Sequence, residues 1–291
     1  MSSIAHTVLR PLAWILIGTG IAFAVISMWL GFSHRQDSAL LREQALAIAP
    51  PTSSIGRRVE LLNAWVYRNK GFAKNQRYFW IARLGPTPVD VLQAGGDCSD
   101  KSRLLSAMLR EIGIESSLAM LYPCSDCAAV HTVVLARSEN GWIAADPVYD
   151  ITFPDAKGGY ETLDRVVSND HALIERVALL RVDRGPGDKI NYYDPVINTY
   201  RYLTTINWKK NGQLRLAAKG LESVGYDPET FPRPYVLEDP KYALVWLFSG
   251  SSLALVAVGW MALVLSRRVR RLHARGNRGE AACGNEAAPL R

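Results

Sequence analysis

Two long apolar runs without a charged residue, at 12–32 and 242–266, constrain this 291-residue chain most. A helix needs about 20 such residues to cross the hydrocarbon core of a membrane. Neither run carries the polar stripe of a helix that packs against a soluble core. Tryptophans lie near the ends of both runs, as is typical at the membrane–water interface: Trp14, Trp29, Trp246 and Trp260. We therefore expect transmembrane helices at 12–32 and 242–266, which flank a domain at 33–241.

The first run is expected to stay attached as an anchor. Signal peptides have an apolar segment of about 7–15 residues followed closely by a small-residue cleavage site. The run at 12–32 is longer than that, and the nearest small-residue pattern, Ala45-Leu46-Ala47, is well separated from its end.

The net charge of +7 does not indicate a nucleic-acid partner. Basic and acidic residues balance over 35–240, so the excess lies outside the domain, mostly in the tail at 267–291. Basic residues next to a span remain on the cytoplasmic side of a membrane. We expect a two-pass protein of the cytoplasmic membrane, with a lead at 1–11 and the basic tail inside and the domain outside, in the periplasm or its equivalent. Most of the basic residues of the tail follow the second run directly: Arg267, Arg268, Arg270, Arg271, Arg275 and Arg278.

Between the spans, the apolar spacing predicts an α+β domain. Helices are expected over 55–70, 101–112 and 160–182, and strands over 117–122, 131–136 and 142–145, the last two joined by a hairpin at 138–141. Helices followed by consecutive hairpin strands are typical of an α+β fold with an antiparallel sheet. No secondary structure is predicted for 188–215, whose aromatic residues would line a groove or pack in a core. Residues 228–240 are expected to be a polar linker, and the tail from Arg275 to be disordered.

Cys98 lies where the turn Gly95-Gly96-Asp97 leads into a predicted helix. The free N–H groups and positive dipole of a helix N-terminus favour a thiolate over a thiol. This position therefore predicts a nucleophile. The alternative is an inert buried thiol, which is how most free cysteines occur.

A cysteine nucleophile needs a general base, and histidine titrates near neutral pH. Of the five histidines, His6 and His273 are expected in the cytoplasm and His34 next to the membrane. His171 begins a polar helical stretch. His131 opens an apolar strand, which holds a side chain rigidly, so we predict that His131 is the base.

The imidazole in turn needs an acceptor that orients it. Asp146 ends the strand that pairs with the strand of His131, and a hairpin places such positions within reach of each other. Taken alone, Asp146 before a proline is also an ordinary strand end. An oxyanion hole would use the Cys98 N–H and one side-chain donor, for which Gln93 is the nearest upstream candidate and an ordinary loop amide is the alternative.

Together these residues resemble the transglutaminase-like superfamily. The resemblance covers about 55–150 and rests on Gly96-Asp97-Cys98, Leu109-Arg110-Glu111-Ile112-Gly113-Ile114, His131, Trp142 and Asp146-Pro147. The stretch Pro86-Thr87-Pro88-Val89-Asp90-Val91-Leu92 before the cysteine is similar to bacterial transglutaminase-like cysteine proteinases. The resemblance implies a papain-like core at about 55–180, in which a helix bearing the cysteine packs on an antiparallel sheet. It also implies acyl-transfer or amide-hydrolysing chemistry with no cofactor, in which Cys98 is the nucleophile, His131 the base and Asp146 the orienting group.

The sequence departs from the bacterial proteinases directly after the cysteine. Those enzymes commonly have Glu and then Asp there, whereas this chain has Ser99 and Asp100. Some of them bind calcium near that acidic cluster. Here Asp97 and Asp100 are only weak calcium candidates, and no metal is expected.

Cys124 and Cys127 are separated by two residues and permit several interpretations. An oxidising exterior favours a short disulfide loop. Two unpaired thiols are an alternative, and so is zinc bound together with His131, although such a site would lack ligands and remove the base. A redox role is the last alternative, but the two cysteines do not precede a helix in a βαβ unit, which is the usual position of a redox pair. Cys283 lies in the predicted cytoplasmic tail.

The sequence thus predicts an enzyme, a cysteine acyltransferase or amide hydrolase that acts on protein, peptide or glycan-linked amides outside the membrane through a thioester at Cys98. A non-catalytic scaffold with the same fold, used in envelope or exopolysaccharide assembly, is the alternative. Redox chemistry through Cys124 and Cys127 is a third possibility.

Overall fold

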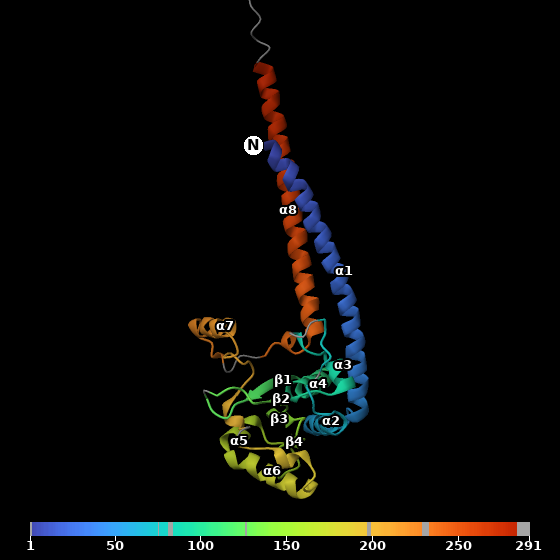
Figure 1. The fold of residues 1–291 in the computed structure, drawn as a ribbon, viewed down its shortest axis with the longest axis vertical. Coiled ribbons are helices and arrows are strands. Elements are labelled where there is room, and N and C mark those ends of the chain that lie inside the picture. Colours follow the sequence, from blue (N-terminus) through green and yellow to red (C-terminus); the bar gives the residue numbers. More distant parts are fainter. Residues whose placement is uncertain are drawn as a thin grey trace, which may run out of the picture. The chain divides into compact units, whose positions relative to one another are not determined.

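The structure is a computed structural model that describes residues 2–74, 76–80, 84–125, 127–196, 199–228 and 233–283. The chain divides into two compact units, of which one joins Met1–His34 to Lys241–Arg291 and the other is Arg35–Pro240. Figure 1 shows the elements of both. The side chains of His6 and His273 and the last part of the predicted tail, residues 284–291, lie outside the described residues.

The first unit contains the larger part of two long helices, α1 (Ser2–Ile48) and α8 (Pro240–Cys283), and residues 35–48 of α1 belong to the second unit. Their apolar segments, Leu9–Ile48 and Pro240–Arg271, are long and apolar enough to cross a membrane and contain the predicted spans. The Ser27 hydroxyl donates to the Val245 carbonyl at 3.0 Å. A Cβ added at Gly20 would lie 2.8 Å from a Val256 methyl group, so the two helices approach closely at this small residue.

Both helices extend beyond the predicted spans. After the span predicted at 12–32, α1 continues without a break to Ile48. Leu41 and Ala45 lie one turn apart in this extension and are buried in the core of the second unit. The expectation of disorder from Arg275 was wrong for the described residues, since α8 continues to Cys283.

The second unit contains a five-stranded antiparallel sheet of order β4-β3-β2-β1-β5. Its strands are β1 (Ser116–Leu121), β2 (His131–Ser138), β3 (Gly141–Asp146), β4 (Ile151–Thr152) and β5 (Leu203–Thr204). The first three agree with the predicted strands to within two residues. The α+β class and the antiparallel sheet are therefore confirmed.

Helices cover both faces of the sheet. α2 (Ile55–Asn69) and α4 (Cys98–Glu111) pack on one face together with Val134 and Ala136 of β2. α5 (Leu163–Ser168) and α6 (Asp170–Arg184) pack on the other face, together with Val133 and Leu135. This alternation follows the two-residue period of a strand, and each fully buried Val or Leu stabilises the fold by about 1.5–3 kcal/mol.

The structure contains elements that the sequence did not predict. The region at 160–182 is two helices rather than one, and Asn169 caps the second by accepting from the His171 N–H at 3.2 Å. The unpredicted helices are α3 (Pro88–Ala94) and α7 (Gly212–Ser223), together with 3-10 helices at Lys189–Tyr192, Tyr200–Tyr202 and Tyr235–Leu237.

The predicted linker at 228–240 is only partly a linker. The Glu238 carboxylate is 1% exposed and accepts from the Ser106 hydroxyl at 2.9 Å and from the Leu118 N–H at 3.3 Å. These bonds attach the segment to α4 and β1. The prediction failed because the sequence around Glu238 is polar and contains prolines. Such a stretch does not reveal that two distant donors form hydrogen bonds to its carboxylate and allow it to be buried.

Candidate active site

Two glycines shape the turn that places Cys98. Gly95 has φ +77°, and a Cβ there would lie 2.7 Å from the Gly71 carbonyl oxygen. A Cβ at Gly96 would lie 2.3 Å from the Asp100 Cβ. Both positions therefore require glycine, the first because of its left-handed backbone and both because of close contacts. This requirement explains the Gly-Gly that precedes Asp97 and Cys98.

Asp97 caps helix α4 directly before Cys98. Its Oδ1 atom accepts from the Ser99 N–H at 3.0 Å and from the Asp100 N–H at 3.1 Å. Cys98 is the first residue of the helix and is half-buried. Its own N–H is one of the donors that a helix N-terminus leaves without an intrahelical partner. The thiol and an available backbone donor therefore share one residue.

His131 and Asp146 form a buried pair. The His131 Nε2 atom lies 2.7 Å from Asp146 Oδ2, and the two side chains are 6% and 0% exposed. The register of β2 with β3 pairs Val134 with Ala145. It therefore places Asp146 beside Val133, on the same face of the sheet as His131. The other carboxylate oxygen accepts from the Val148 N–H at 2.8 Å, which fixes the orientation of the carboxylate.

The pKa of His131 is raised to about 10. Burial alone would lower it, but the charge of Asp146, the hydrogen bond to Asp146 and a hydrogen bond to Cys98 outweigh burial. Because a carboxylate only accepts, the Nε2–H group donates to Asp146 and Nδ1 is left for Cys98. The structure thus pairs His131 with Asp146, and Cys98 acts on the pKa of the same histidine. As a catalytic triad, the three residues remain a prediction.

Tyr149 is part of this neighbourhood, although the sequence reasoning did not select it. Its ring centroid lies 5.7 Å from that of His131 and 4.7 Å from that of Tyr193. Burial, then the charges of Asp146 and Cys98, raise the pKa of Tyr149. Its position in the sequence, three residues after Asp146, could have indicated this proximity. A tight turn after a strand keeps the next few residues close to the end of that strand.

Lys101 is a second residue that the sequence reasoning missed. It follows Cys98 by one helical turn, its side chain is fully buried, and no described residue forms a hydrogen bond with its Nζ atom. Burial and the charge of Lys189 lower its pKa to about 8, and Asp146 acts in the opposite direction. A buried amine therefore lies within electrostatic range of the carboxylate that orients His131.

Gln93 remains only a predicted oxyanion residue. It lies near the end of α3 with an exposed side chain, and its Oε1 atom accepts from Arg77 Nη1 at 2.9 Å. This contact leaves the amide NH₂ group as a donor. No hydrogen bond between Gln93 and Cys98 occurs among the described residues.

The two weak calcium candidates have structural partners. Asp97 caps α4, and the Asp100 carboxylate lies 3.0 Å from Arg103 Nη1. Burial, followed by the charge of Asp97, raises the pKa of Asp100. Within the described ranges, no cluster of three or more His, Cys, Asp and Glu residues could hold a metal ion.

Cys124 and Cys127 are joined by a disulfide in the structure. This bond is incompatible with the alternatives of two free thiols or of zinc bound by both sulfurs. Asp126, between them, lies outside the described residues. His171, the other histidine of the domain, is exposed in the first turn of α6 and is not part of the site.

A helix that carries a cysteine at its N-terminus and packs on an antiparallel sheet that carries a histidine and an aspartate defines an α+β domain with the transglutaminase-like fold. Residues 42–147 match the sequence model of the transglutaminase-like superfamily, and this range includes Cys98, His131 and Asp146. The chain therefore carries a domain of that superfamily.

Two solved structures resemble parts of the chain. One is named as a "putative cysteine protease" from Cytophaga hutchinsonii, with 18% identity and a TM-score of 0.33 over 42% of this chain and 40% of that one. The other is named as a "putative protease" from Parabacteroides distasonis, with 16% identity and a TM-score of 0.30 over 44% of this chain and 26% of that one. The chain thus spans less than half the length of either structure. No curated protein matches the sequence.

Proposed function

We propose that this chain is a membrane-anchored cysteine acyltransferase or amide hydrolase that uses Cys98, His131 and Asp146. The observation that carries the proposal is the 2.7 Å contact between His131 and Asp146, together with the influence of Cys98 on the pKa of the same histidine. A scaffold does not need a buried histidine aligned between a carboxylate and a cysteine.

The reaction begins with the proton of Cys98 already held on His131 Nδ1, because the raised pKa keeps this imidazole protonated at neutral pH. The sulfur then attacks the carbonyl carbon of an amide, and the negative charge that develops on the oxygen is stabilised by the Cys98 N–H at the start of α4. His131 returns the proton to the departing amine as the C–N bond breaks, which leaves a thioester. Water or an acceptor amine then attacks the thioester, and the proton it gives up returns to the thiol through His131.

Asp146 orients this exchange without touching the substrate. Its hydrogen bond fixes the imidazole with Nδ1 towards Cys98, and its negative charge stabilises the imidazolium form of His131. The Val148 N–H in turn holds the carboxylate. We propose protein, peptide or glycan-linked amides as substrates, since each presents the amide that the mechanism requires.

The cellular location follows from the two apolar helices. We infer that both cross the cytoplasmic membrane and that the basic residues after the second remain inside, which places Arg35–Pro240 outside. The Cys124–Cys127 disulfide is consistent with an oxidising exterior. An alkaline phosphatase reporter fused after α8 should be inactive, whereas the same reporter inserted in the domain should be active. The reverse pattern would contradict this orientation.

The enzymatic proposal is tested with the full chain purified in detergent. Cell-envelope protein and a biotin-labelled primary amine are supplied, and thioester formation at Cys98, amine incorporation and peptide release are followed by mass spectrometry. Cys98→Ala and His131→Ala should abolish all three signals. His171→Ala is the matched control, because it removes the other histidine of the domain, and it should leave them unchanged.

The outcomes separate the candidate functions. Incorporation of the amine identifies a transferase, and peptide release without incorporation identifies a hydrolase. Turnover that persists in Cys98→Ala would refute the mechanism. No thioester under any condition, with an unreactive Cys98, would favour the scaffold.

A further inference from the structure

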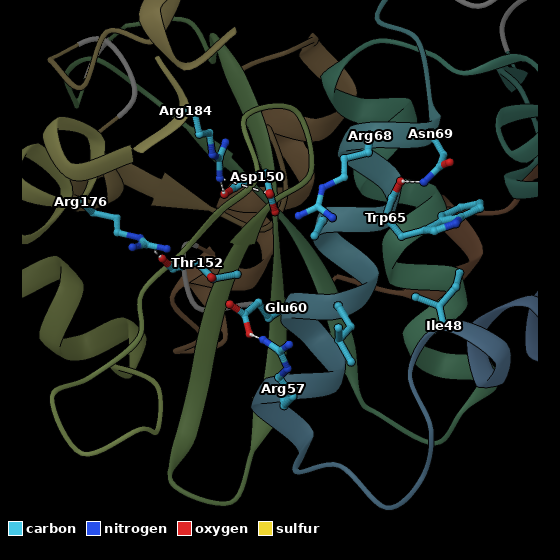
Figure 2. Close-up of a pocket in the computed structure, with 12 residues that line it drawn as sticks. Ile48, Arg57, Glu60, Trp65, Arg68, Asn69, Asp150, Thr152, Arg176 and Arg184 are labelled. Atoms are coloured by element: carbon cyan, nitrogen blue, oxygen red, sulfur yellow. Dashed lines mark hydrogen bonds and ion pairs between the residues drawn. The ribbon is translucent and has the colours of Figure 1, made fainter. Parts of the chain in front are cut away.

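A pocket lies between helices α2 and α6, away from Cys98. Its volume is about 440 Å³, and none of Cys98, His131 and Asp146 lines it. Figure 2 shows charged side chains around it, with α2 contributing from one side and α6 from the other. Those that matter for its chemistry are Arg57, Glu60, Arg68, Asp150, Arg176 and Arg184.

The charges that line this pocket are not balanced. Arg57 forms an ion pair with Glu60, and Arg184 Nη2 lies 3.2 Å from the Asp150 carboxylate. These two pairs engage both carboxylates of the lining, and Asp188 also lies 3.9 Å from Arg184 Nη1. Among the described residues, neither Arg68 nor Arg176 forms an ion pair, although Arg68 lowers the pKa of Asp150 and the charges of Glu60, Asp150 and Asp183 act on Arg176. The lining itself therefore carries four arginines against two carboxylates.

Arg176 is the more unusual of the two. Its Nε–H group donates to the Thr152 carbonyl at 2.8 Å, which fixes the planar guanidinium but uses only one of its five N–H groups. The side chain is half-buried. Burial and the charge of Arg184 lower its pKa, whereas the charges of Glu60, Asp150 and Asp183 act in the opposite direction. An anion in the pocket would further stabilise a partly desolvated guanidinium that is held beside a second one.

Arg68 completes the arrangement from the opposite wall. In Figure 2 its guanidinium group extends from α2 towards the middle of the pocket, and that of Arg176 enters from α6. Two guanidinium forks that approach one space from opposite sides match the several oxygens of a tetrahedral anion. The excess of arginines over carboxylates in the lining also favours a dianion over a single carboxylate.

We propose that this pocket binds a phosphoryl group. A phosphate dianion would be held between Arg68 and Arg176, with Arg57 and Arg184 adding positive potential while they remain paired to their carboxylates. The pocket is larger than a phosphate ion, and Trp65 and Asn69 in its wall leave room for an organic substituent. The ligand class is therefore a phosphate monoester, either soluble or as a lipid headgroup.

The test uses the full chain in detergent and does not depend on the reaction at Cys98. Binding of inorganic phosphate and of glycerol 3-phosphate is measured by calorimetry and by the shift of the thermal unfolding midpoint, with sodium chloride at equal ionic strength as the reference. We expect saturable binding and a higher midpoint with both phosphates. Cosedimentation with phosphatidylcholine vesicles that do or do not contain phosphatidic acid reports whether a lipid headgroup is also accepted.

Variants assign the binding to the pocket. Arg176→Gln and Arg68→Gln should each weaken phosphate binding at least tenfold. Arg176→Lys keeps the charge without the fork and should bind with intermediate affinity. Arg215→Gln removes an exposed arginine on α7 and should bind like the parent chain. Arg184 is avoided, because its Nη1 atom also donates to the Tyr149 carbonyl at 2.7 Å and supports the turn next to His131.

Two results would overturn the proposal. One is a response to phosphate no greater than the response to chloride at equal ionic strength. The other is phosphate binding that persists unchanged in both glutamine variants, provided that their far-UV circular dichroism matches that of the parent chain.

Discussion

Replacing Lys101 with methionine tests whether a charged amine is buried behind the nucleophile. Methionine has similar length without the charge, so it keeps most of the packing of the side chain. Burial, with a contribution from Lys189, lowers the pKa of Lys101 from 10.5 to about 8. The folded chain therefore disfavours the ammonium form relative to the unfolded chain.

The magnitude follows from linkage. A depressed pKa of a basic group means that folding incurs a penalty that is fully present below the folded value of about 8 and absent above the unfolded value of 10.5. A pKa difference of one between the folded and unfolded chain corresponds to about 1.4 kcal/mol, so the penalty is about 3 kcal/mol. For a domain of this size, that free energy corresponds to about 6–12 °C in the thermal unfolding midpoint.

The assay compares the unfolding midpoints of the parent chain and Lys101→Met in detergent from pH 7 to pH 11. The parent should gain stability relative to the variant as the pH rises from about 8 to above 10.5. Lys219→Met, which removes an exposed lysine on α7, serves as the control and should show no such trend. If the difference between the parent and Lys101→Met stays constant over this range, Lys101 is not desolvated and the reasoning is refuted.

Two further predictions concern the turn before Cys98 and the orienting carboxylate. Gly96→Ala should lower the free energy of unfolding by about 1–3 kcal/mol, because its Cβ would collide with Asp100. The control Gly220→Ala, at an open position within α7, should raise that free energy by about 0.5–1 kcal/mol. Both changes are measured by thermal unfolding. A Gly96→Ala variant as stable as the parent would show that the turn is less tightly packed than described. Asp146→Asn should move the alkaline limb of the pH–activity profile down by at least about one pH unit, because Asp146 raises the pKa of His131 and only a protonated His131 can donate to the leaving amine. An unchanged limb would mean that Asp146 does not control that protonation.

The sequence predicted those parts of the fold that depend on periodicity. Strands β1, β2 and β3 and the helix that begins at Cys98 have clear apolar patterns in the sequence. These patterns were sufficient to predict the fold class. Helix α3 was not predicted, although Thr87 and Asp90 of its capping box flank a proline in the first helical turn. Helix α7 was harder to predict, since only Ala218 of its residues is buried.

Long-range contacts explain what the sequence could not provide. The carboxylate of Glu238 is buried by a hydroxyl and an N–H from residues more than a hundred positions earlier in the chain. The burial of the Lys101 amine without a hydrogen-bond partner likewise depends on how the helices pack. The same is true of the positions of Arg68 and Arg176 in one pocket. Elimination among few histidines selected His131, whereas the contact of Tyr149 with its ring depends on the conformation of the turn after Asp146.

The reactivity of Cys98 towards iodoacetamide tests the central claim most directly. The rate constant for alkylation of Cys98 is measured at pH 6 by mass spectrometry and compared with that of free cysteine. If His131 activates the thiol, Cys98 reacts much faster than free cysteine, the advantage disappears in His131→Ala, and it persists in His171→Ala. A Cys98 that reacts no faster than free cysteine, at a rate independent of His131, would contradict the account.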